Sequence, residues 1–254
     1  MDLKSKIILI YGPTASGKSK FAVKLAKKIK GEIINADSMQ VYKELKILSA
    51  RPLPKDYEKI KHHLYGFQSV KNNFSTGEWL KLVNKKILGV KKRKNVPILV
   101  GGTGLYFKAL TEGLVNIPKI PIKLRKKIRS LHTKLGSKKF FLKLIKLDPL
   151  VRKHINPSDT QRLIRAYEIK LSTKKSMYDW FKNTKSNYQQ KDFYKIYIDF
   201  PRKELLERIS FRAKKMFEKG VILEVKRFIK LKVLKDKSAN KAIGISEVKQ
   251  YLSK

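Results

Sequence analysis

The sequence predicts an α/β fold, a doubly wound parallel sheet organised around a P-loop and interrupted by an inserted helical subdomain. Three observations lead to this prediction. Residues 12–19 read GPTASGKS, a complete phosphate-binding loop between a strand-like and a helix-like run. Short apolar runs alternate with helix-like segments toward both ends of the 254-residue chain. Between them lies a long basic segment in which the apolar residues recur only at helical spacing.

Four apolar runs are predicted to be strands of the sheet. They are short and lack strict alternation, as expected of parallel strands that are buried on both faces. The predicted strands are Lys6–Tyr11, Glu32–Ala36, Val96–Val100 and Tyr194–Asp199. The predicted helices of the sheet layers are Lys18–Lys30, Ser75–Lys92, Gly104–Glu112 and Pro201–Glu218.

The middle of the chain differs from its two ends. Apolar residues there recur at helical spacing, first at Leu124, Ile128 and Leu131 and again from 141 to 147. We therefore predict a P-loop core in two parts, 1–117 and 191–254, with C-terminal helices in the second part. Residues 118–190 are predicted to be the inserted helical subdomain.

Charge narrows the range of partners. The chain has 61 Lys and Arg against 20 Asp and Glu, a formal net charge of +41. Such an excess repels itself in the folded state unless counterions or a polyanion offset it, which favours a nucleic-acid partner. A lysine-rich composition without a function explains the same numbers, because lysine is scattered through every surface segment. Both explanations stay open.

Other features of the composition exclude several kinds of site. The chain has no cysteine, which rules out disulfides and thiolate metal sites and fits a reducing cytoplasm. No apolar run approaches the ~20 residues of a membrane span. The first predicted strand begins too near the N-terminus to leave room for a signal peptide. We expect a cytoplasmic monomer without membrane contact.

The P-loop predicts binding of a phosphorylated compound. Its two glycines let successive N–H groups point inward, and the following helix adds the positive end of its dipole. Lys18 supplies a charge to the outer phosphates, and the Ser19 hydroxyl is a candidate ligand for Mg²⁺. A chance glycine-rich turn would not explain the flanking strand and helix. The predicted cofactor-binding residues are Gly12, Pro13, Thr14, Ala15, Ser16, Gly17, Lys18 and Ser19.

Two further segments follow predicted strands, whose carboxyl ends form the ligand-binding edge of a parallel sheet. Asp37 and Ser38 come after the second strand. The carboxylate can bind Mg²⁺, accept a ribose hydroxyl, act as a general base or merely cap the following turn. The glycine-rich run 101–104 comes after the third strand, where an ATPase usually has an acidic residue for Mg²⁺. This loop therefore favours a displaced diphosphate over ATP hydrolysis.

Three weaker patterns involve histidine and arginine. His62 and His63 would face opposite ways in a strand and lack acidic residues at metal-ligand spacing, so a zinc site is not expected. Arg208 and Arg212 share one face of a predicted helix, which is either functional or an exposed basic face. Residues 158–165 begin another helix, whose glutamine and arginines suit phosphate or base contacts, although its aspartate can simply cap it.

Taken together, these segments resemble the bacterial tRNA dimethylallyltransferases. The motifs that carry the resemblance occur in the family's order and cover nearly the whole chain: GPTASGKS, NADSMQVYKEL, SARP, HHLYGF, PILVGGTGLYFKAL, LDPLVRKHINPSDTQRLIRAYEI, RISFRAKKMFEKGVILEV and ANKAIGISEV. That family transfers a dimethylallyl group from its diphosphate to N6 of the adenine next to the anticodon. The resemblance implies this reaction, Mg²⁺ as cofactor, and the tRNA anticodon stem-loop and dimethylallyl diphosphate as partners.

The resemblance also implies roles for individual residues. Asp37 is implied as the base that acts on the adenine amine, Thr14 as a catalytic member of the diphosphate site, and Arg212 as a group that neutralises the leaving diphosphate. The implied tRNA contacts are Asp37, Ser38, Met39, Gln40, Thr103, Arg125, Gln161, Arg162, Leu163, Ile164 and Arg165, together with Ala239 to Gly244.

The chain departs from the family pattern in places, and alternatives stay open. It has SARP, STKK and GISE where the family more often has GTAKP, a TGK-like turn and GYKE. The family usually continues some tens of residues past Tyr251 with a basic-aromatic segment. A P-loop kinase of a nucleotide or small metabolite explains GPTASGKS and Asp37 equally well, but not the net charge. A non-catalytic RNA-binding ATP switch is disfavoured by the glycine after Val100.

Overall fold

The computed structural model describes residues 3–253, which form two compact units. The core unit contains the residues up to 111 and those from 188 onward, and the helical unit is Glu112–Asn187. Each unit has its own hydrophobic clusters and is described by itself. No helix within residues 3–253 is both long and apolar enough to cross a membrane.

The core unit is built on a five-stranded parallel sheet, which confirms the predicted fold class. Its strands are β1 (Ile7–Tyr11), β2 (Gly31–Asn35), β3 (His62–His63), β4 (Val96–Val100) and β5 (Phe193–Tyr197). They lie in the order β3-β2-β4-β1-β5, and every neighbouring pair is parallel. The two-residue β3 was not among the predicted strands, because two histidines offer no apolar pattern to detect.

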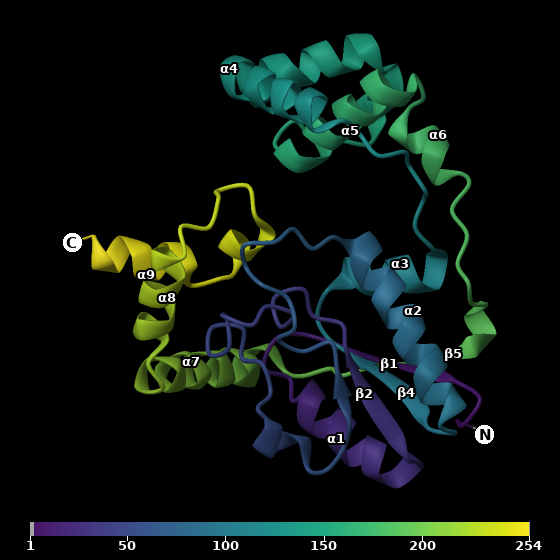
Figure 1. The fold of residues 1–254 in the computed structure, drawn as a ribbon, viewed down its shortest axis with the longest axis vertical. Helices are drawn as coiled ribbons and strands as arrows, with labels where there is room; N and C mark the ends of the chain where they lie inside the picture. The colour runs from purple at the N-terminus through teal and green to yellow at the C-terminus, as the bar shows by residue number, and fades with distance from the viewer. Residues whose placement is uncertain (1–2, 254) are drawn as a thin grey trace. The chain divides into compact units, whose positions relative to one another are not determined.

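Helices cover both faces of this sheet (Figure 1). The helices of the core unit are α1 (Lys18–Ile29), α2 (Thr76–Lys92), α3 (Gly104–Glu112), α7 (Arg202–Glu218), α8 (Val221–Lys230) and α9 (Ile245–Leu252), with 3-10 turns at Pro54–Tyr57, Gln190–Asp192 and Ser238–Lys241. α1 packs on Ile8 and Ile10, whereas α2 packs on Ile7 and Leu9. Successive strand residues point to opposite faces, so a strand between two helical layers is largely apolar.

The two C-terminal helices brace the loop that follows β2. Phe228 of α8 and Ile245 of α9 pack with Val41, Tyr42 and Leu45 of that loop in one buried cluster. A loop that leaves a sheet edge would otherwise be exposed and mobile. The tertiary structure therefore gives the residues after β2 a fixed support made from the end of the chain.

The helical unit is organised around two packed helices. It contains α4 (Ile122–Leu147), α5 (Thr160–Thr173), α6 (Met177–Phe181) and a 3-10 turn at Pro149–Lys153. Its core includes Phe140 and Leu144 of α4 and Leu163 of α5. Gly136 interrupts α4 with φ 71°, so the two apolar stretches recognised in the sequence belong to two halves of a kinked helix.

Candidate functional site

The candidate site lies at the carboxyl ends of three neighbouring strands, β2, β4 and β1. β1 leads into the P-loop, β2 leads into Asp37, and β4, which lies between them, leads into Gly101 and Gly102. A Cβ on Gly101 would stand 2.1 Å from the carbonyl oxygen of Ala36, so only glycine fits there. The middle strand therefore places no side chain from these two positions between Asp37 and the P-loop.

The P-loop connects β1 to α1 through a tightly curved backbone. Gly12 has φ 150°, and a Cβ there would stand 2.5 Å from the carbonyl oxygen of Ile198. Gly17 has φ 88° and occupies the left-handed position immediately before α1. Both glycines of the motif are required by the path of the chain, one by close approach and the other by its backbone angle.

Lys18, the first residue of α1, lies inside this loop. Its amine donates hydrogen bonds to the carbonyl oxygens of Gly12 at 2.9 Å and Pro13 at 2.5 Å. Burial lowers the pKa of Lys18, the Asp37 carboxylate opposes that shift, and Arg212 adds to it. The amine thus lies within electrostatic reach of both the carboxylate after β2 and a guanidinium of α7.

One buried hydroxyl of the P-loop has no protein partner. Ser16 is 4 % exposed, and its Oγ makes no hydrogen bond to any atom of residues 3–253. Buried polar atoms are normally paired, and an exception inside a phosphate-binding loop suggests a partner on a ligand. The nearby hydroxyl residues Thr14 and Ser19 are exposed. Together these three side chains suit a phosphate-bearing compound.

A metal ion at this site would take most of its ligands from the bound compound. The described part of the chain has no group of three or more His, Asp or Glu side chains suited to hold an ion. Mg²⁺ in phosphate sites often has only one or two protein ligands, with phosphate oxygens and water completing its shell. Ser19 fits that arrangement, because it is exposed at the P-loop and lines the cavity described below.

Asp37 caps the turn that follows it and still presents a second oxygen. Its Oδ1 accepts hydrogen bonds from the backbone N–H groups of Met39 at 2.9 Å and Gln40 at 3.3 Å. The capping role considered for this residue is therefore present. Its Oδ2 faces Gly102, where a Cβ would stand 4.0 Å away. One carboxylate oxygen orders the loop, and the other lies toward the glycines that follow β4.

Asn35, which the sequence did not assign to the site, and Thr103, which it did, hold Asp37 and Ser38 in place. Asn35, fully buried at the end of β2, accepts from the Asp37 N–H at 2.9 Å and donates to the Asp37 carbonyl oxygen at 2.9 Å. The hydroxyl of Thr103 accepts from the Ser38 N–H at 2.9 Å. A single amide directly after the apolar pair Ile33 and Ile34 was the signal for Asn35, since a buried polar side chain needs partners.

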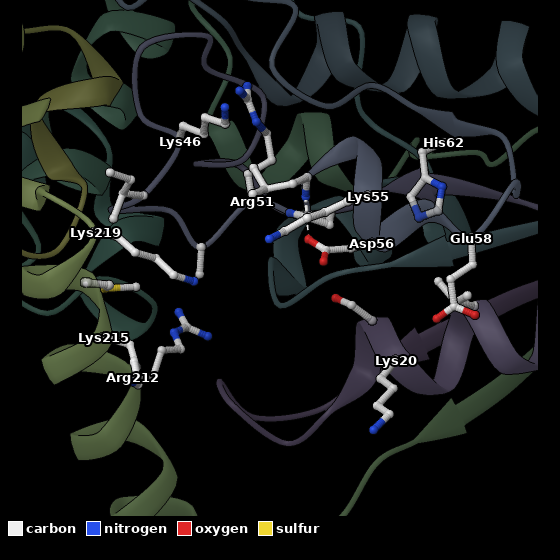
Figure 2. Close-up of a pocket in the computed structure, with 17 residues that line it drawn as sticks. Lys20, Lys46, Arg51, Lys55, Asp56, Glu58, His62, Arg212, Lys215 and Lys219 are labelled. Carbon is white, nitrogen blue, oxygen red and sulfur yellow. Dashed lines mark hydrogen bonds between the residues drawn. The ribbon is translucent and has the colours of Figure 1, made fainter.

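A cationic cavity of about 950 Å³ opens beside the P-loop. Figure 2 shows Arg212 of α7 and Lys219, the residue that follows this helix, reaching toward the segment that carries Arg51 and Lys55. The cationic lining residues are Lys20, Lys46, Arg51, Lys55, Arg212, Lys215 and Lys219, against Asp56 and Glu58 as the acidic ones. This excess of positive charge suits an anion larger than a single phosphate.

The two arginines of α7 have different environments. Arg208 stacks over the ring of Phe200 at 3.8 Å, so it does not share the role of its neighbour one turn later. Arg212 is partly buried and lines the cavity. Burial lowers the pKa of Arg212, and the Asp37 carboxylate opposes that shift. The sequence left open whether this pair is functional or forms an exposed basic face. Arg212 is partly buried, so it does not belong to an exposed basic face.

A distant carboxylate holds the segment 46–48, whose first two residues line the cavity. Glu224 of α8 accepts hydrogen bonds from the N–H groups of Lys46 at 2.9 Å, Ile47 at 2.8 Å and Leu48 at 2.9 Å. Three successive amides around one carboxylate form a strong, charge-assisted set of hydrogen bonds. No local sequence pattern indicated this contact, because its partners are 176–178 residues apart.

The helical unit contains the remaining predicted residues. Arg125 on α4 and Arg165 on α5 are exposed and lie on either side of Glu168, while Gln161 and Arg162 are exposed at the start of α5. Asp159 caps that helix, because its Oδ1 accepts from the Arg162 N–H at 3.1 Å. Ile164 is half-buried.

Leu163 corrects the sequence prediction of a surface contact. Its side chain is 0 % exposed and belongs to the core of the helical unit. In a helix, a run of five consecutive residues spans more than one turn, so some members of the run must face the core. The side chain therefore stabilises the unit and does not face a ligand.

Comparison with known sequences decides which family this fold and site belong to. A family profile described as IPP transferase matches residues 40–254. The chain belongs to the IPP transferase family. The P-loop and Asp37 precede the profile match, but they lie within full-length alignments to individual relatives. The resemblance inferred from the sequence motifs is confirmed.

Among curated relatives, this IPP transferase family member is similar to the tRNA dimethylallyltransferase of Pelagibacter ubique strain HTCC1062. The two are 60 % identical over 253 residues, which cover 100 % of this chain and 81 % of that protein. It is 44 % identical over 252 residues to the tRNA dimethylallyltransferase of Rickettsia massiliae strain Mtu5, covering 98 % of this chain and 69 % of the relative.

Solved structures give the same assignment. The tRNA isopentenylpyrophosphate transferase of Bacillus halodurans aligns with a TM-score of 0.66 and 31 % identity over 98 % of this chain and 78 % of that one. A eukaryotic dimethylallyltransferase described as acting on tRNA aligns with a TM-score of 0.82 and 27 % identity, over 98 % of this chain and 63 % of that one.

Proposed function

We propose that this chain transfers a dimethylallyl group from dimethylallyl diphosphate to N6 of the adenine adjacent to the anticodon in tRNA, releasing diphosphate. The observation that carries the proposal is the electrostatic interaction of Asp37 with both Lys18 and Arg212, beside a P-loop and a cationic cavity. This arrangement supports the diphosphate end of the reaction. The names of the relatives support the tRNA end.

The P-loop and α7 are proposed to act on the diphosphate. As the bond between the allylic carbon and the diphosphate oxygen breaks, negative charge develops on the leaving group. The loop amides, the Lys18 amine and the Arg212 guanidinium neutralise that charge, and their partial burial strengthens the interaction. The Thr14 and Ser16 hydroxyls are proposed to donate to its oxygens.

Enzymes of this family need a divalent metal. We propose that the metal is Mg²⁺ and that the Ser19 hydroxyl is its protein ligand. When bound, the ion supplies additional positive charge to the departing diphosphate. The exposure of Ser19 at the cavity supports this assignment.

Asp37 is proposed to accept the proton that the adenine amine loses. That amine is a poor nucleophile, because its lone pair is delocalised into the ring, so a proton must leave as the new bond forms. Oδ1 is occupied by the amides of Met39 and Gln40, which leaves Oδ2, facing the glycines after β4, as the acceptor. The buried Asn35 fixes the backbone that carries this group.

The tRNA is proposed to contact residues of both units. An adenine must leave its stack to reach a buried site, and an adenine in a single-stranded loop does so at the smallest energetic cost. The proposed contacts in the core unit are Asp37, Ser38, Met39, Gln40 and Thr103. Those in the helical unit are Arg125, Gln161, Arg162, Ile164 and Arg165. We expect one copy of the chain per tRNA, which the solution mass of the complex would check.

Labelled substrates test the proposal directly. The chain is incubated with labelled dimethylallyl diphosphate or labelled ATP, each with and without unmodified tRNA. We expect the dimethylallyl label alone to move, and only to tRNA. Transfer of the ATP phosphate to a nucleotide or small molecule would instead support the kinase. ATP binding without transfer of either label would indicate a non-catalytic switch.

A further inference from the structure

A buried carboxylate in the helical unit lies among three arginines. Glu168 of α5 has a side chain only 2 % exposed. Its Oε1 lies 3.6 Å from Nε of Arg125 and 3.9 Å from Nε of Arg129, both on α4. Its Oε2 lies 3.5 Å from Nη1 of Arg165. Arg129 did not figure among the residues that the sequence indicated.

These contacts are long for a buried ion group. Nitrogen–oxygen hydrogen bonds fall at about 2.7–3.2 Å, and beyond that range the attraction is mainly that of charge on charge. Glu168 Oε1 has no hydrogen-bond partner within residues 3–253, although it is buried. A buried carboxylate that served only stability would be expected to hold its partners closely.

The guanidinium groups remain accessible to a ligand. The side chains of Arg125, Arg129 and Arg165 are 45 %, 45 % and 44 % exposed. Residues 125 and 129 are one turn apart on α4, and Arg165 is three residues before Glu168 on α5, so a single carboxylate gathers all three. With one negative and three positive charges, this group carries a net charge of +2 and many guanidinium N–H donors that no carboxylate oxygen saturates.

We propose that Glu168 is a positioning residue that holds Arg125, Arg129 and Arg165 as one phosphate-binding cluster for the tRNA backbone. This inference rests on the proposed function and adds Arg129 to the RNA contacts. Guanidinium forks pair bidentately with phosphate, so their orientation matters as well as their charge. The buried carboxylate restricts that orientation before RNA arrives, which reduces the entropy lost on binding.

Removing the negative charge of Glu168 distinguishes positioning from simple electrostatics. Glu168→Gln makes the surface more positive, so charge alone predicts tighter tRNA binding. Positioning predicts the opposite: the Kd should rise on the order of tenfold, the effect of losing one charge-assisted hydrogen bond between a guanidinium and an RNA phosphate. The KM for tRNA should rise while kcat at saturating tRNA stays unchanged, because none of these residues acts on the diphosphate.

Asp179→Asn is the matched control. It removes one negative charge from the same unit, where Asp179 lies 3.1 Å from the amine of Lys182 on the protein surface. We expect its tRNA Kd to be equal to that of the wild type or lower. The inference is overturned if folded Glu168→Gln binds tRNA as tightly as Asp179→Asn.

A second pair of variants decides the matter if Glu168→Gln does not fold. Arg129→Lys keeps the charge but removes the planar fork, and should weaken tRNA binding severalfold. Arg152→Lys makes the same change at an exposed arginine that, within residues 3–253, forms no ion pair with Glu168, and should leave the Kd within about twofold. Equal affinities for these two variants would contradict the inference. Wild-type chain that transfers no dimethylallyl group to tRNA would instead refute the proposed function itself.

Discussion

Two buried glutamates, one in each unit, use the same side chain in different ways. Glu32 of β2 and Glu168 of α5 are both only 2 % exposed. Glu32 accepts two hydrogen bonds from Arg93 at 2.8 Å and one from Asn95 at 2.7 Å, and lies 2.6 Å from Nε2 of His63. The guanidinium nitrogens paired with Glu168 are 3.5–3.9 Å from its carboxylate oxygens.

This difference in nitrogen–oxygen distance distinguishes a structural ion cluster from one whose arginines can still bind a ligand. Burial alone would raise the pKa of Glu32, but the hydrogen bonds from Arg93, His63 and Asn95 outweigh it and lower the value to about 2. That carboxylate is saturated by the protein and lies at the opposite end of β2 from Asp37. Glu168 leaves its arginines with unsaturated donors. Contact distance, more than burial or charge, separates the two roles.

The largest expected effect tests whether chemistry belongs to the core unit alone. Asp37→Ala should lower the rate of transfer at saturating tRNA by ~10²–10⁴, the usual effect of losing a general base. The tRNA Kd should change little by comparison. Single-turnover rates with labelled dimethylallyl diphosphate measure the first quantity and filter binding the second. Asp236→Ala, at an exposed position of the same unit, is the control. If the Asp37→Ala variant keeps more than half of the wild-type rate, Asp37 is not the base and only caps the turn that follows it.

The next effect concerns the diphosphate end of the site. Lys18→Ala should reduce kcat/KM for dimethylallyl diphosphate on the order of 10²–10³, as when one donor to a developing negative charge is removed. Ser19→Ala should raise the Mg²⁺ concentration needed for half-maximal activity. Titrations of activity and of diphosphate binding against Mg²⁺ measure this shift. An unchanged Mg²⁺ dependence would show that Ser19 is not a ligand.

A stability measurement tests the structural role assigned to Glu32. The folded pKa of about 2 is below the ordinary value of 4.5, so the stabilisation is present above pH 4.5 and is lost as the pH falls toward 2. Glu32→Gln should therefore lower the free energy of unfolding by roughly 2–3 kcal/mol at pH 7, and the deficit should shrink at pH 3. Urea unfolding at both pH values measures it.

Glu58→Gln is the matched control for that experiment, because it removes an exposed ion pair with Lys27. Solvent screens such an exposed pair, so its loss should change the free energy of unfolding far less than the loss of Glu32. If Glu32→Gln weakened tRNA binding while leaving stability intact, the contrast between the two buried glutamates would be wrong.

The smallest effect concerns an arginine outside the Glu168 cluster. Arg162 pairs with Asp159 at 3.3 Å and is exposed. If it contacts a single-stranded phosphate, Arg162→Gln should flatten the log–log salt dependence of tRNA binding by about 0.7. Binding at several salt concentrations measures the slope, with Lys235→Gln of the core unit as a charge-matched control. Equal slopes for both variants would remove Arg162 from the proposed contacts.

Local patterns in the sequence were enough for the framework of this protein. The P-loop could be recognised because strand, turn glycines and helix start are contiguous, and backbone geometry at each position depends on neighbouring residues. β1 and β4 were visible because burial on both faces makes them continuously apolar, and β2 and β5 were visible from shorter apolar stretches beside Glu32 and Lys195. The family was evident from motifs in order along the chain, and the comparisons confirm it.

Contacts between distant segments were decided only by the tertiary structure. Packing brings Arg212 into electrostatic reach of Asp37 and Lys18, and it brings Glu224 to the amides of residues 46–48. It also turns Leu163 into the core and gathers Arg129 around Glu168. None of these follows from spacing along the chain, because the energy that fixes them comes from burial and charge between elements that meet only in the folded state.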